Sequence, residues 1–346
     1  SIMVTFNIDP FSVGENSEIE APNGAKFDSN DGIMASLIEM LLEQRDLAKK
    51  EKNQIKAHAL KITMNSFYGA IASPKSRFHN RDVGEAITSF GRELMSETIK
   101  YIESKGYIGI YGDTDSVFVS SGNKFASLDE KTQFGSKLEQ EINNFVATYV
   151  AKKTNRESKL IIEFEKLFSQ FFIASKKRYT GFDELSSKLT FTGMEAIRGD
   201  WTTLAQEFQV ELVKLIFKGA KEEELKKFIL EEVKKLESGA YDSKLVYTKK
   251  ITKPLVEYTK TTPPHVKAAR ELDEFSGKIV KYVMLESGPT HVSLVTKRLE
   301  RGEKYDYKHY IEKQLDGVSD DLLEHLNIDF KEVIGSKKQK NLSQFF

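Results

Sequence analysis

The sequence contains no cysteine, and only seven prolines and one tryptophan occur among its 346 residues. Without cysteine, disulfide bonds and thiolate metal sites are excluded. The six histidines do not pair at the spacing that zinc sites use. No apolar run approaches the roughly 18 residues of a membrane-spanning helix, so we expect no membrane partner.

Net charge is absent too, because Lys plus Arg and Asp plus Glu number 52 each. The global charge therefore does not indicate nucleic-acid binding, and any basic surface has to be local. With 39% hydrophobic and 30% charged residues, the chain fits a globular protein of two or three compact units. The start, Ser1-Ile2-Met3-Val4, lacks the features of a signal peptide, so we expect a cytoplasmic protein.

Helical periodicity dominates the first third of the chain. Residues 33–44 and 54–68 each have a helical pattern, and the short break near Lys52-Asn53 predicts an antiparallel helical hairpin. A long amphipathic helix is predicted over residues 83–104, ending at Gly106.

Mixed structure comes next along the chain. We expect a β-hairpin at residues 107–120, a helix at 129–152 and strands through 159–194. After Trp201 the composition shifts to charge-dense helical segments, which indicates a domain boundary. Prolines then break the later region into short pieces. The predicted fold class is therefore α+β.

Two carboxylates, Asp113 and Asp115, lie one residue apart between apolar runs. In extended chain such residues point to the same side. Two like charges so close repel each other unless a cation lies between them, and Mg²⁺ prefers carboxylate oxygens. The alternative is a solvated turn, since Asp, Gly, Thr and Ser are common turn residues.

The helical hairpin carries a second candidate site. Arg45 and Lys49 are four residues apart on the first helix, and Lys61 and Asn65 on the second, so each pair shares a face. If the hairpin closes, the four could converge on one anion such as a triphosphate. A solvated basic face is the alternative for each of them, and Tyr68 and Gly69 could be only a core aromatic and a helix terminator.

These segments together resemble family B replicative DNA polymerases, most of all archaeal members. The carrying motifs are Lys61-x-x-x-Asn65-Ser66-x-Tyr68-Gly69, Tyr111-Gly112-Asp113-Thr114-Asp115-Ser116, Lys176-Lys177-Arg178-Tyr179, and Gly193-Met194-Glu195 with Arg198-Gly199-Asp200-Trp201. Beyond them, Pro264-His265-Val266 is the best local match.

The resemblance implies the right-hand fold of a polymerase, without the family's amino-terminal and exonuclease domains. Its parts would be the start of the palm after motif A (1–30), the helical-hairpin fingers (31–72), an antiparallel-sheet palm (73–200), a mostly helical thumb (201–334) and a clamp-binding tail (335–346).

The implied activity is that of a DNA-directed DNA polymerase, a nucleotidyltransferase that adds deoxynucleotides to a primer 3′ end during replication. Its partners would be primer-template DNA and dNTP, its cofactor two Mg²⁺ ions, and its place the cytoplasm, near the nucleoid. By resemblance, the incoming dNTP would be bound by Arg45, Lys49, Lys61, Asn65 and Tyr68. The catalytic metal ligands would be Asp113 and Asp115.

Further residues take roles by resemblance alone. The DNA would be contacted by Lys176, Lys177, Arg178 and Tyr179. Glu163 and Glu165 alternate on a predicted strand and resemble a palm acidic pair, with structural ion pairing as the alternative.

One departure changes the interpretation. The family has another catalytic aspartate on a strand that ends Ser-Leu-Tyr-Pro-Ser-Ile, and this chain begins at the end of that phrase, at Ser1-Ile2. Two carboxylates alone cannot hold two Mg²⁺ in octahedral geometry. We therefore expect a carboxy-terminal part that is active only with a separate amino-terminal half. A split intein, an ordinary gene split and a trimmed chain stay open as explanations.

The tail ends Gln339-Lys340-Asn341-Leu342-Ser343-Gln344-Phe345-Phe346, which resembles the peptide that docks on PCNA-like sliding clamps. One turn of 3₁₀ helix would bring Leu342, Phe345 and Phe346 to one apolar pocket, with Gln339 hydrogen-bonded beside it. The alternative is that the tail folds back onto the thumb.

Two other functions compete with polymerisation of DNA. One is a non-catalytic DNA- and clamp-binding scaffold descended from a polymerase. Retention of the Asp113 and Asp115 pair together with Lys61, Asn65 and Tyr68 argues against it. The other is RNA polymerisation or reverse transcription, open because the family's ribose-excluding tyrosine lies outside this sequence.

Overall fold

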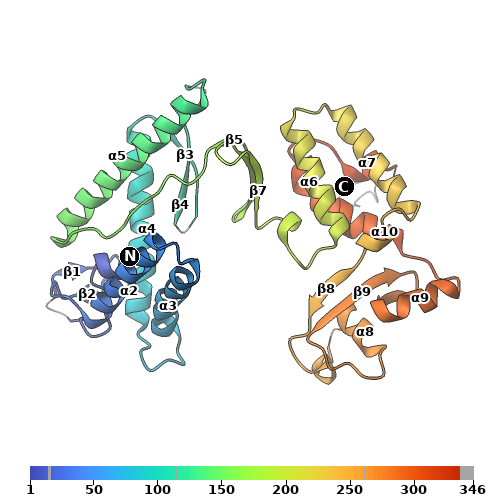
Figure 1. The fold of residues 1–346 in the computed structure, drawn as a ribbon, viewed down its shortest axis with the longest axis horizontal. Coiled ribbons are helices and arrows are strands. Elements are labelled where there is room, and N and C mark those ends of the chain that lie inside the picture. The colour runs from blue at the N-terminus through green and yellow to red at the C-terminus, as the bar shows by residue number, and fades with distance from the viewer. Residues whose placement is uncertain (15–16, 114, 123, 261, 336–346) are drawn as a thin grey trace, which may run out of the picture. The chain divides into compact units, whose positions relative to one another are not determined.

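The computed structural model describes residues 1–335 apart from 15–16, 114, 123 and 261. The chain divides into two compact units, Ser1–Leu167 and Phe168–Phe346 (Figure 1). Within the described ranges, no helix is both long and apolar enough to cross a membrane.

The first unit is mainly helical. Its elements in chain order are α1 (Ile2–Thr5), β1 (Ile19–Glu20), β2 (Lys26–Phe27), α2 (Ile33–Lys50), α3 (Gln54–Ala72), α4 (Arg81–Ser104), β3 (Ile108–Asp113), β4 (Ser116–Ser120) and α5 (Leu128–Thr154).

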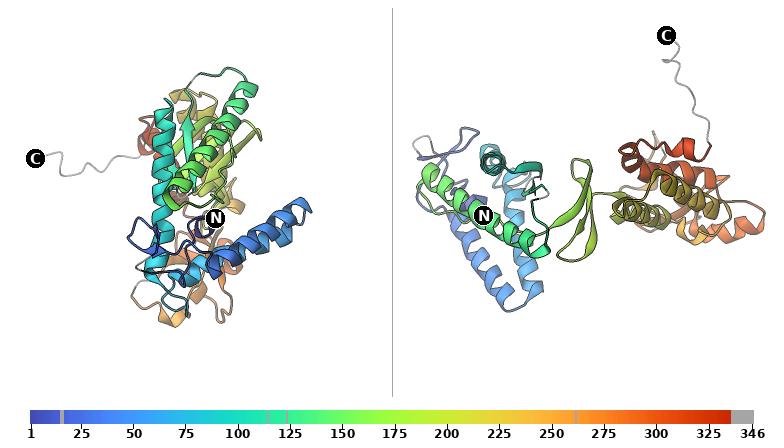
Figure 2. Two further views of the ribbon diagram at one scale, coloured as in Figure 1. Left: turned by 90° about the vertical axis from the view of Figure 1, so that its left-hand side faces the viewer. Right: turned by 90° about the horizontal axis from the view of Figure 1, so that it is seen from above.

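The predicted helical hairpin is confirmed in α2 and α3, which pack along each other. Figure 2 (left) shows the pair in blue, running together away from the long helix α4. The connection is short because Lys52 takes a left-handed conformation (φ 57°) and Asn53 caps α3, its side chain accepting a hydrogen bond from Lys56 N at 3.0 Å.

The core of the first unit forms where α1, α4 and α5 meet. Phe6 and Phe90 are fully buried and stack with ring centroids 3.9 Å apart. Helix α4 begins at the cap Asn80, whose side chain accepts from Val83 N, and ends before Gly106 (φ 80°), as predicted. The antiparallel hairpin β3–β4 packs on α4.

The second unit mixes sheets and helices. Its strands are β5 (Phe168–Ser175), β6 (Arg178–Asp183), β7 (Lys188–Thr192), β8 (Tyr247–Lys250), β9 (Ile279–Leu285) and β10 (Gly288–His291). Its α-helices are α6 (Thr203–Phe217), α7 (Glu222–Glu237), α8 (Pro264–Arg270), α9 (Val292–Glu300), α10 (Tyr307–Tyr310), α11 (Asp316–Glu324) and α12 (Phe330–Val333). Short 3₁₀ turns lie at η1 (Glu195–Ile197), η2 (Asp242–Lys244) and η3 (Leu255–Glu257), and a π-helical turn, η4 (Ile311–Leu315), joins α10 to α11.

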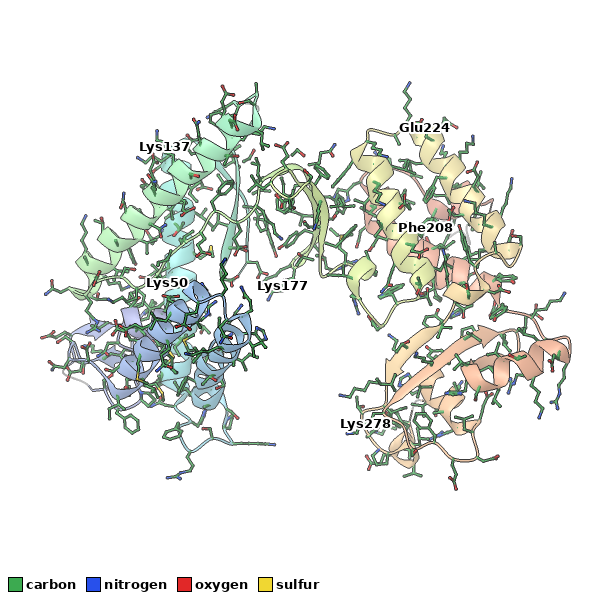
Figure 3. The ribbon with its side chains drawn as sticks, in the orientation of Figure 1. Lys50, Lys137, Lys177, Phe208, Glu224 and Lys278 are labelled. Carbon is green, nitrogen blue, oxygen red and sulfur yellow. The ribbon has the colours of Figure 1, made fainter. Side chains whose placement is uncertain are left out.

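Two antiparallel sheets, β5–β6–β7 and β8–β9–β10, flank a helical core in this unit. Phe208 on α6 stacks on Phe228 of α7, with ring centroids 5.4 Å apart (Figure 3). The π-helical turn places Gln314 in the core, where its Oε1 accepts from the hydroxyl of Thr202, the cap of α6, at 2.8 Å. This bond ties the beginning of α6 to the long helix α10–η4–α11.

One predicted element is wrong. The structure assigns residues 159–167 to no strand, and the first strand of this region begins at Phe168. A side chain replaces the missing ladder: Asn143 on α5 donates to Ile162 O at 2.8 Å and accepts from Ile162 N at 2.9 Å. An apolar extended segment can therefore be held by an amide side chain instead of by a neighbouring strand.

Candidate active site

The carboxylate pair lies at the end of the predicted β-hairpin, which the structure confirms. Asp113 ends β3 opposite Ser116 of β4, and Asp115 lies in the connection between them. The N–H of Asp115 donates to the carbonyl of Asp113 at 2.5 Å. Asp113 is half-buried and Asp115 is exposed. The second acid therefore belongs to the turn, so the strand alternation expected for the pair does not apply to it.

A bulge in β3 sets the direction of Asp113. The register shifts between Gly109 and Tyr111. A Cβ atom on Gly109 would lie 3.3 Å from Ile99 on α4, and one on Gly112 would lie 3.4 Å from the same side chain. Residues three apart in a regular strand face opposite sides, so the bulge brings both glycines to α4. The next residue, Asp113, then faces away from α4.

The donors at this turn fit a hard cation only in part. Carboxylate oxygens are the ligands Mg²⁺ takes. Yet no group of three or more metal-ligating side chains gathers anywhere in the described ranges. Asp113 and Asp115 could thus form one side of a magnesium site, and the remaining ligands would have to come from substrate, water or another segment.

The basic residues of the helical hairpin lie where helical spacing predicts. Arg45 on α2 is half-buried, whereas Lys49, Lys61 and Asn65 are exposed. The Arg45 Nε atom is buried and has no hydrogen-bond partner among the described residues. A buried guanidinium nitrogen without a partner is costly, so an anion bound there would be stabilised.

Tyr68 and Gly69 do not have the structural roles considered as alternatives. Tyr68 is 40% exposed, so it is not a core aromatic. Helix α3 continues past Gly69 to Ala72, so Gly69 does not terminate it. A Cβ on Gly69 would meet nothing within 4 Å. The end of α3 therefore presents an aromatic ring beside open backbone.

Two buried residues that hold the start of α2 have no recognisable signal in the sequence. Asp9 is fully buried, and its carboxylate accepts from Met34 N at 2.5 Å and from Phe11 N at 2.7 Å. Asn7 accepts from Gly32 N at 2.8 Å and donates to the carbonyls of Asp28 and Asn30. A carboxylate at a helix N-terminus is stabilising. These bonds fix the direction in which the helical hairpin leaves the unit.

In the second unit the basic motif forms a tight turn. Lys176 and Lys177 connect β5 to β6, where Ser175 pairs with Arg178 (Figure 3). Both lysines are exposed, and Lys177 is left-handed (φ 65°). Tyr179 packs on Phe171 with ring centroids 5.4 Å apart.

Arg178 differs from its neighbours because it is committed to ion pairs. Its guanidinium donates to both oxygens of Glu195, at 2.8 and 2.9 Å, and to Asp321 at 2.6 Å. Burial lowers the pKa of Arg178, but the hydrogen bonds and charges of the two carboxylates outweigh it and raise the pKa. The ion pairs therefore stabilise the charged form of Arg178.

The other predicted site residues are not brought together. Glu163 and Glu165 are exposed on the extended segment 159–167, so their expected strand is absent. Neither makes an ion pair with a described residue. The predicted clamp-binding residues Gln339, Leu342, Phe345 and Phe346 lie outside the described ranges.

Residues 15–326 match the model of DNA polymerase family B. The chain belongs to this family. It is 34% identical over 358 residues to DNA polymerase II of Escherichia coli (strain K12), covering 95% of this chain and 44% of that protein. It is 30% identical over 342 residues to a DNA polymerase of Thermococcus gorgonarius, covering 91% of this chain and 42% of that protein.

A solved structure agrees. The family B DNA polymerase from the archaeon Pyrobaculum calidifontis superposes with a TM-score of 0.63 at 26% identity, covering 95% of this chain and 44% of that one. This family B chain therefore spans less than half the length of the relatives it matches. Both bacterial and archaeal polymerases match this chain, so the matches do not favour the archaeal members over the bacterial ones.

Proposed function

We propose that this chain is the carboxy-terminal catalytic part of a DNA-directed DNA polymerase, with α2–α3 as fingers. The observation that supports the proposal is that this family B chain has Asp113 and Asp115 at the end of a β-hairpin and basic side chains along the helical pair α2–α3. A scaffold without catalysis would not need this set of residues. In this proposal, these residues catalyse the addition of deoxynucleotides to a primer 3′ end.

The incoming triphosphate is bound by the fingers in this proposal. Arg45 supplies a planar fork and Lys49 and Lys61 supply mobile point charges, which together suit a polyphosphate. Asn65 lies one turn beyond Lys61 on the same face of α3. Tyr68 stacks on the nascent base pair, and an aromatic face accepts any base because all bases have a π-face.

The carboxylates Asp113 and Asp115 hold one side of the metal site. Two Mg²⁺ ions, when bound, would activate the primer 3′-hydroxyl and neutralise the triphosphate and departing pyrophosphate. The missing ligand, the motif A aspartate, is supplied by the amino-terminal part of the polymerase. The primer strand is bound by Lys176 and Lys177 in the turn and by Tyr179 at the start of β6. The lysine charges offset those of the DNA phosphates.

A strand from that amino-terminal part would also cover an apolar edge. The β3–β4 sheet has only two strands in the described ranges. Ile108 is 67% exposed and Ile110 is 48% exposed. Exposed isoleucines on a short sheet with free edges favour pairing with a further strand. We infer that this strand carries the motif A aspartate, whether on a separate polypeptide or as a preceding segment.

The test is primer extension by the chain combined with the amino-terminal half, in Mg²⁺. We expect template-dependent incorporation by the complex and little or none by residues 1–346 alone. Asp115→Asn should abolish incorporation while the complex still assembles, because it removes a formal charge where the cations bind. Full-rate extension by residues 1–346 alone, or by the Asp115→Asn complex, would contradict the proposal.

A further inference from the structure

The turn that carries Lys176 and Lys177 is supported from beneath by backbone. Gly193 is left-handed (φ 63°), and a Cβ atom there would overlap the carbonyl oxygen of Lys177. Only glycine fits such a position. The two sequence motifs around Lys177 and Gly193 are therefore parts of one structure, and the conformation of the turn depends on the residues that come after Gly193.

Glu195, two residues later, is 5% exposed and bonds the turn through Arg178. Gln209 on α6 donates to Glu195 Oε2 at 3.0 Å and to the carbonyl of Val318 at 2.8 Å. The same Gln209 accepts from Ala196 N at 2.7 Å. Every polar atom of the Gln209 side chain thus has a partner, and these bonds hold Glu195 in place beneath the turn.

The second carboxylate belongs to a different helix. Asp321 lies on α11 and accepts from Arg178 Nη1 at 2.6 Å. It is partly exposed, whereas Glu195 is buried. The network of Arg178, Glu195, Gln209 and Asp321, called here the Arg178 clamp, therefore joins β6 to η1, α6 and α11.

The charges of the Arg178 clamp disfavour a DNA phosphate. One guanidinium faces two carboxylates, so the local sum is negative. A phosphate at the same guanidinium would lie beside both carboxylates and be repelled by them. Breaking a buried pair leaves an uncompensated charge, which is strongly destabilising. As in Arg45, the Nε atom of Arg178 is buried without a hydrogen-bond partner among the described residues. Here, however, a phosphate would lie beside two carboxylates, so release of Arg178 to DNA is unfavourable.

We infer that Arg178 is a positioning residue and not a phosphate contact: the Arg178 clamp locks the Lys176–Lys177 turn to helices α6 and α11. The inference rests on the proposed function, because it concerns how the turn meets primer DNA. Its consequence is that the turn and these helices act as one rigid body. Lys176 and Lys177 then meet the primer backbone in a fixed geometry, without an ordering cost at each encounter.

The effect of neutralising an acid on DNA affinity distinguishes a positioning role of Arg178 from a phosphate contact. Removing an acid beside bound DNA ordinarily strengthens binding, because a repulsive charge is lost. The Arg178 clamp predicts the opposite for Glu195→Gln and Asp321→Asn, which free the turn. Asp320→Asn is the matched control: it lies on the same helix, is exposed, and forms no ion pair with any residue in the described ranges.

The experiment measures the affinity of the full chain for a primer-template duplex with a recessed 3′ end, over a series of salt concentrations. We expect Glu195→Gln, Asp321→Asn and Arg178→Gln each to weaken binding severalfold while the salt slope stays that of the parent chain. Lys177→Gln should lower the slope by about one, because it removes a phosphate contact. Tighter binding by the two acid variants, or a slope lowered by about one in Arg178→Gln, would overturn the inference.

Hydrogen exchange tests the Arg178 clamp without DNA. We expect the backbone amides of residues 175–180 to exchange faster in Glu195→Gln and Asp321→Asn, but not in Asp320→Asn. Asp321→Asn leaves the buried Glu195 pair intact, so it reports on the Arg178 clamp even if Glu195→Gln does not fold. Unchanged exchange in Asp321→Asn overturns the inference. If the complex with the amino-terminal half does not bind primer-template DNA, the proposed function fails, while the exchange result still decides the Arg178 clamp.

Discussion

Gly112, like Gly109, lies where strand β3 approaches helix α4. A Cβ atom there would lie 3.4 Å from Ile99 and 3.6 Å from Met95. Gly112→Ala adds only this contact, so we expect nearly normal folding and activity. Gly112→Val adds two further carbons, and such overpacking costs about 1–3 kcal/mol. It should also push Asp113, the next residue, out of place.

The measurements are thermal unfolding of the chain and primer extension by the reconstituted polymerase. We expect Gly112→Val to lower both the melting temperature and the incorporation rate, and Gly112→Ala to leave both close to those of the parent. Equal activity of the two variants would show that the contact with α4 does not position Asp113.

For single residues, the sequence predicts a role only where the interacting residues are close together in the chain. The Asp113 and Asp115 pair can be read from the sequence, because only one residue separates the two acids. The bulge between Gly109 and Tyr111 cannot, because it depends on how β3 fits against Ile99. The ion pairs of Arg178 cannot be read from the sequence, because its partners Glu195 and Asp321 lie far along the chain. Its contact with DNA stays a prediction.

Helix α2 depends on Asp9 for its first turn. Replacing a carboxylate that caps a helix by alanine costs about 1–2 kcal/mol. We expect Asp9→Ala to destabilise the chain by about this amount and to raise the KM for dNTP of the reconstituted polymerase. The reason is that α2 carries Arg45 and Lys49, and its direction is set by the bonds from Asp9 and Asn7.

The matched control is Asp82→Asn, at the first turn of α4, where the carboxylate is exposed. It makes a similar charge change at another helix N-terminus and should cost only tenths of a kcal/mol. Its KM should stay that of the parent. Affinity for primer-template DNA should be unaffected in both variants. A KM that rises equally in both would mean that Asp9 has no specific effect on the fingers.

Elements with strong periodicity were predicted well, and those held by distant partners were not. The predicted beginnings of α2, α3 and α4 agree with the structure within a few residues, whereas α2 continues past its predicted end at residue 44 to Lys50. The composition of segment 159–167 predicts a strand. The structure instead has an extended segment without a neighbouring strand, held by the side chain of Asn143. The sheet β8–β9–β10 was not predicted, although Tyr247 and Tyr282 stack across it at 5.0 Å.

For the whole molecule, the sequence motifs predict family B, which the family match confirms, and the chain covers 44% of the E. coli DNA polymerase II. The contacts divide the chain into two units, and the β5–β6–β7 sheet belongs to the same unit as the later helices. The position of this boundary cannot be predicted from composition, because aromatic residues occur both in that sheet and in the segment before it. In the proposed function, the amino-terminal part of the polymerase would cover the exposed isoleucines of β3.

We propose that residues 339–346 bind a sliding clamp. Deleting residues 339–346 should remove any stimulation of processivity by a sliding clamp, because Leu342, Phe345 and Phe346 would be the apolar anchors. Basal incorporation should stay normal, since none of the proposed catalytic residues is lost. Phe345→Ala with Phe346→Ala should reproduce the deletion, and Ser343→Ala, between the anchors, should not. Product lengths on a primed circular template, with and without clamp, give the measurement, and clamp-stimulated products of unchanged length in the deletion variant would reject clamp binding by the tail.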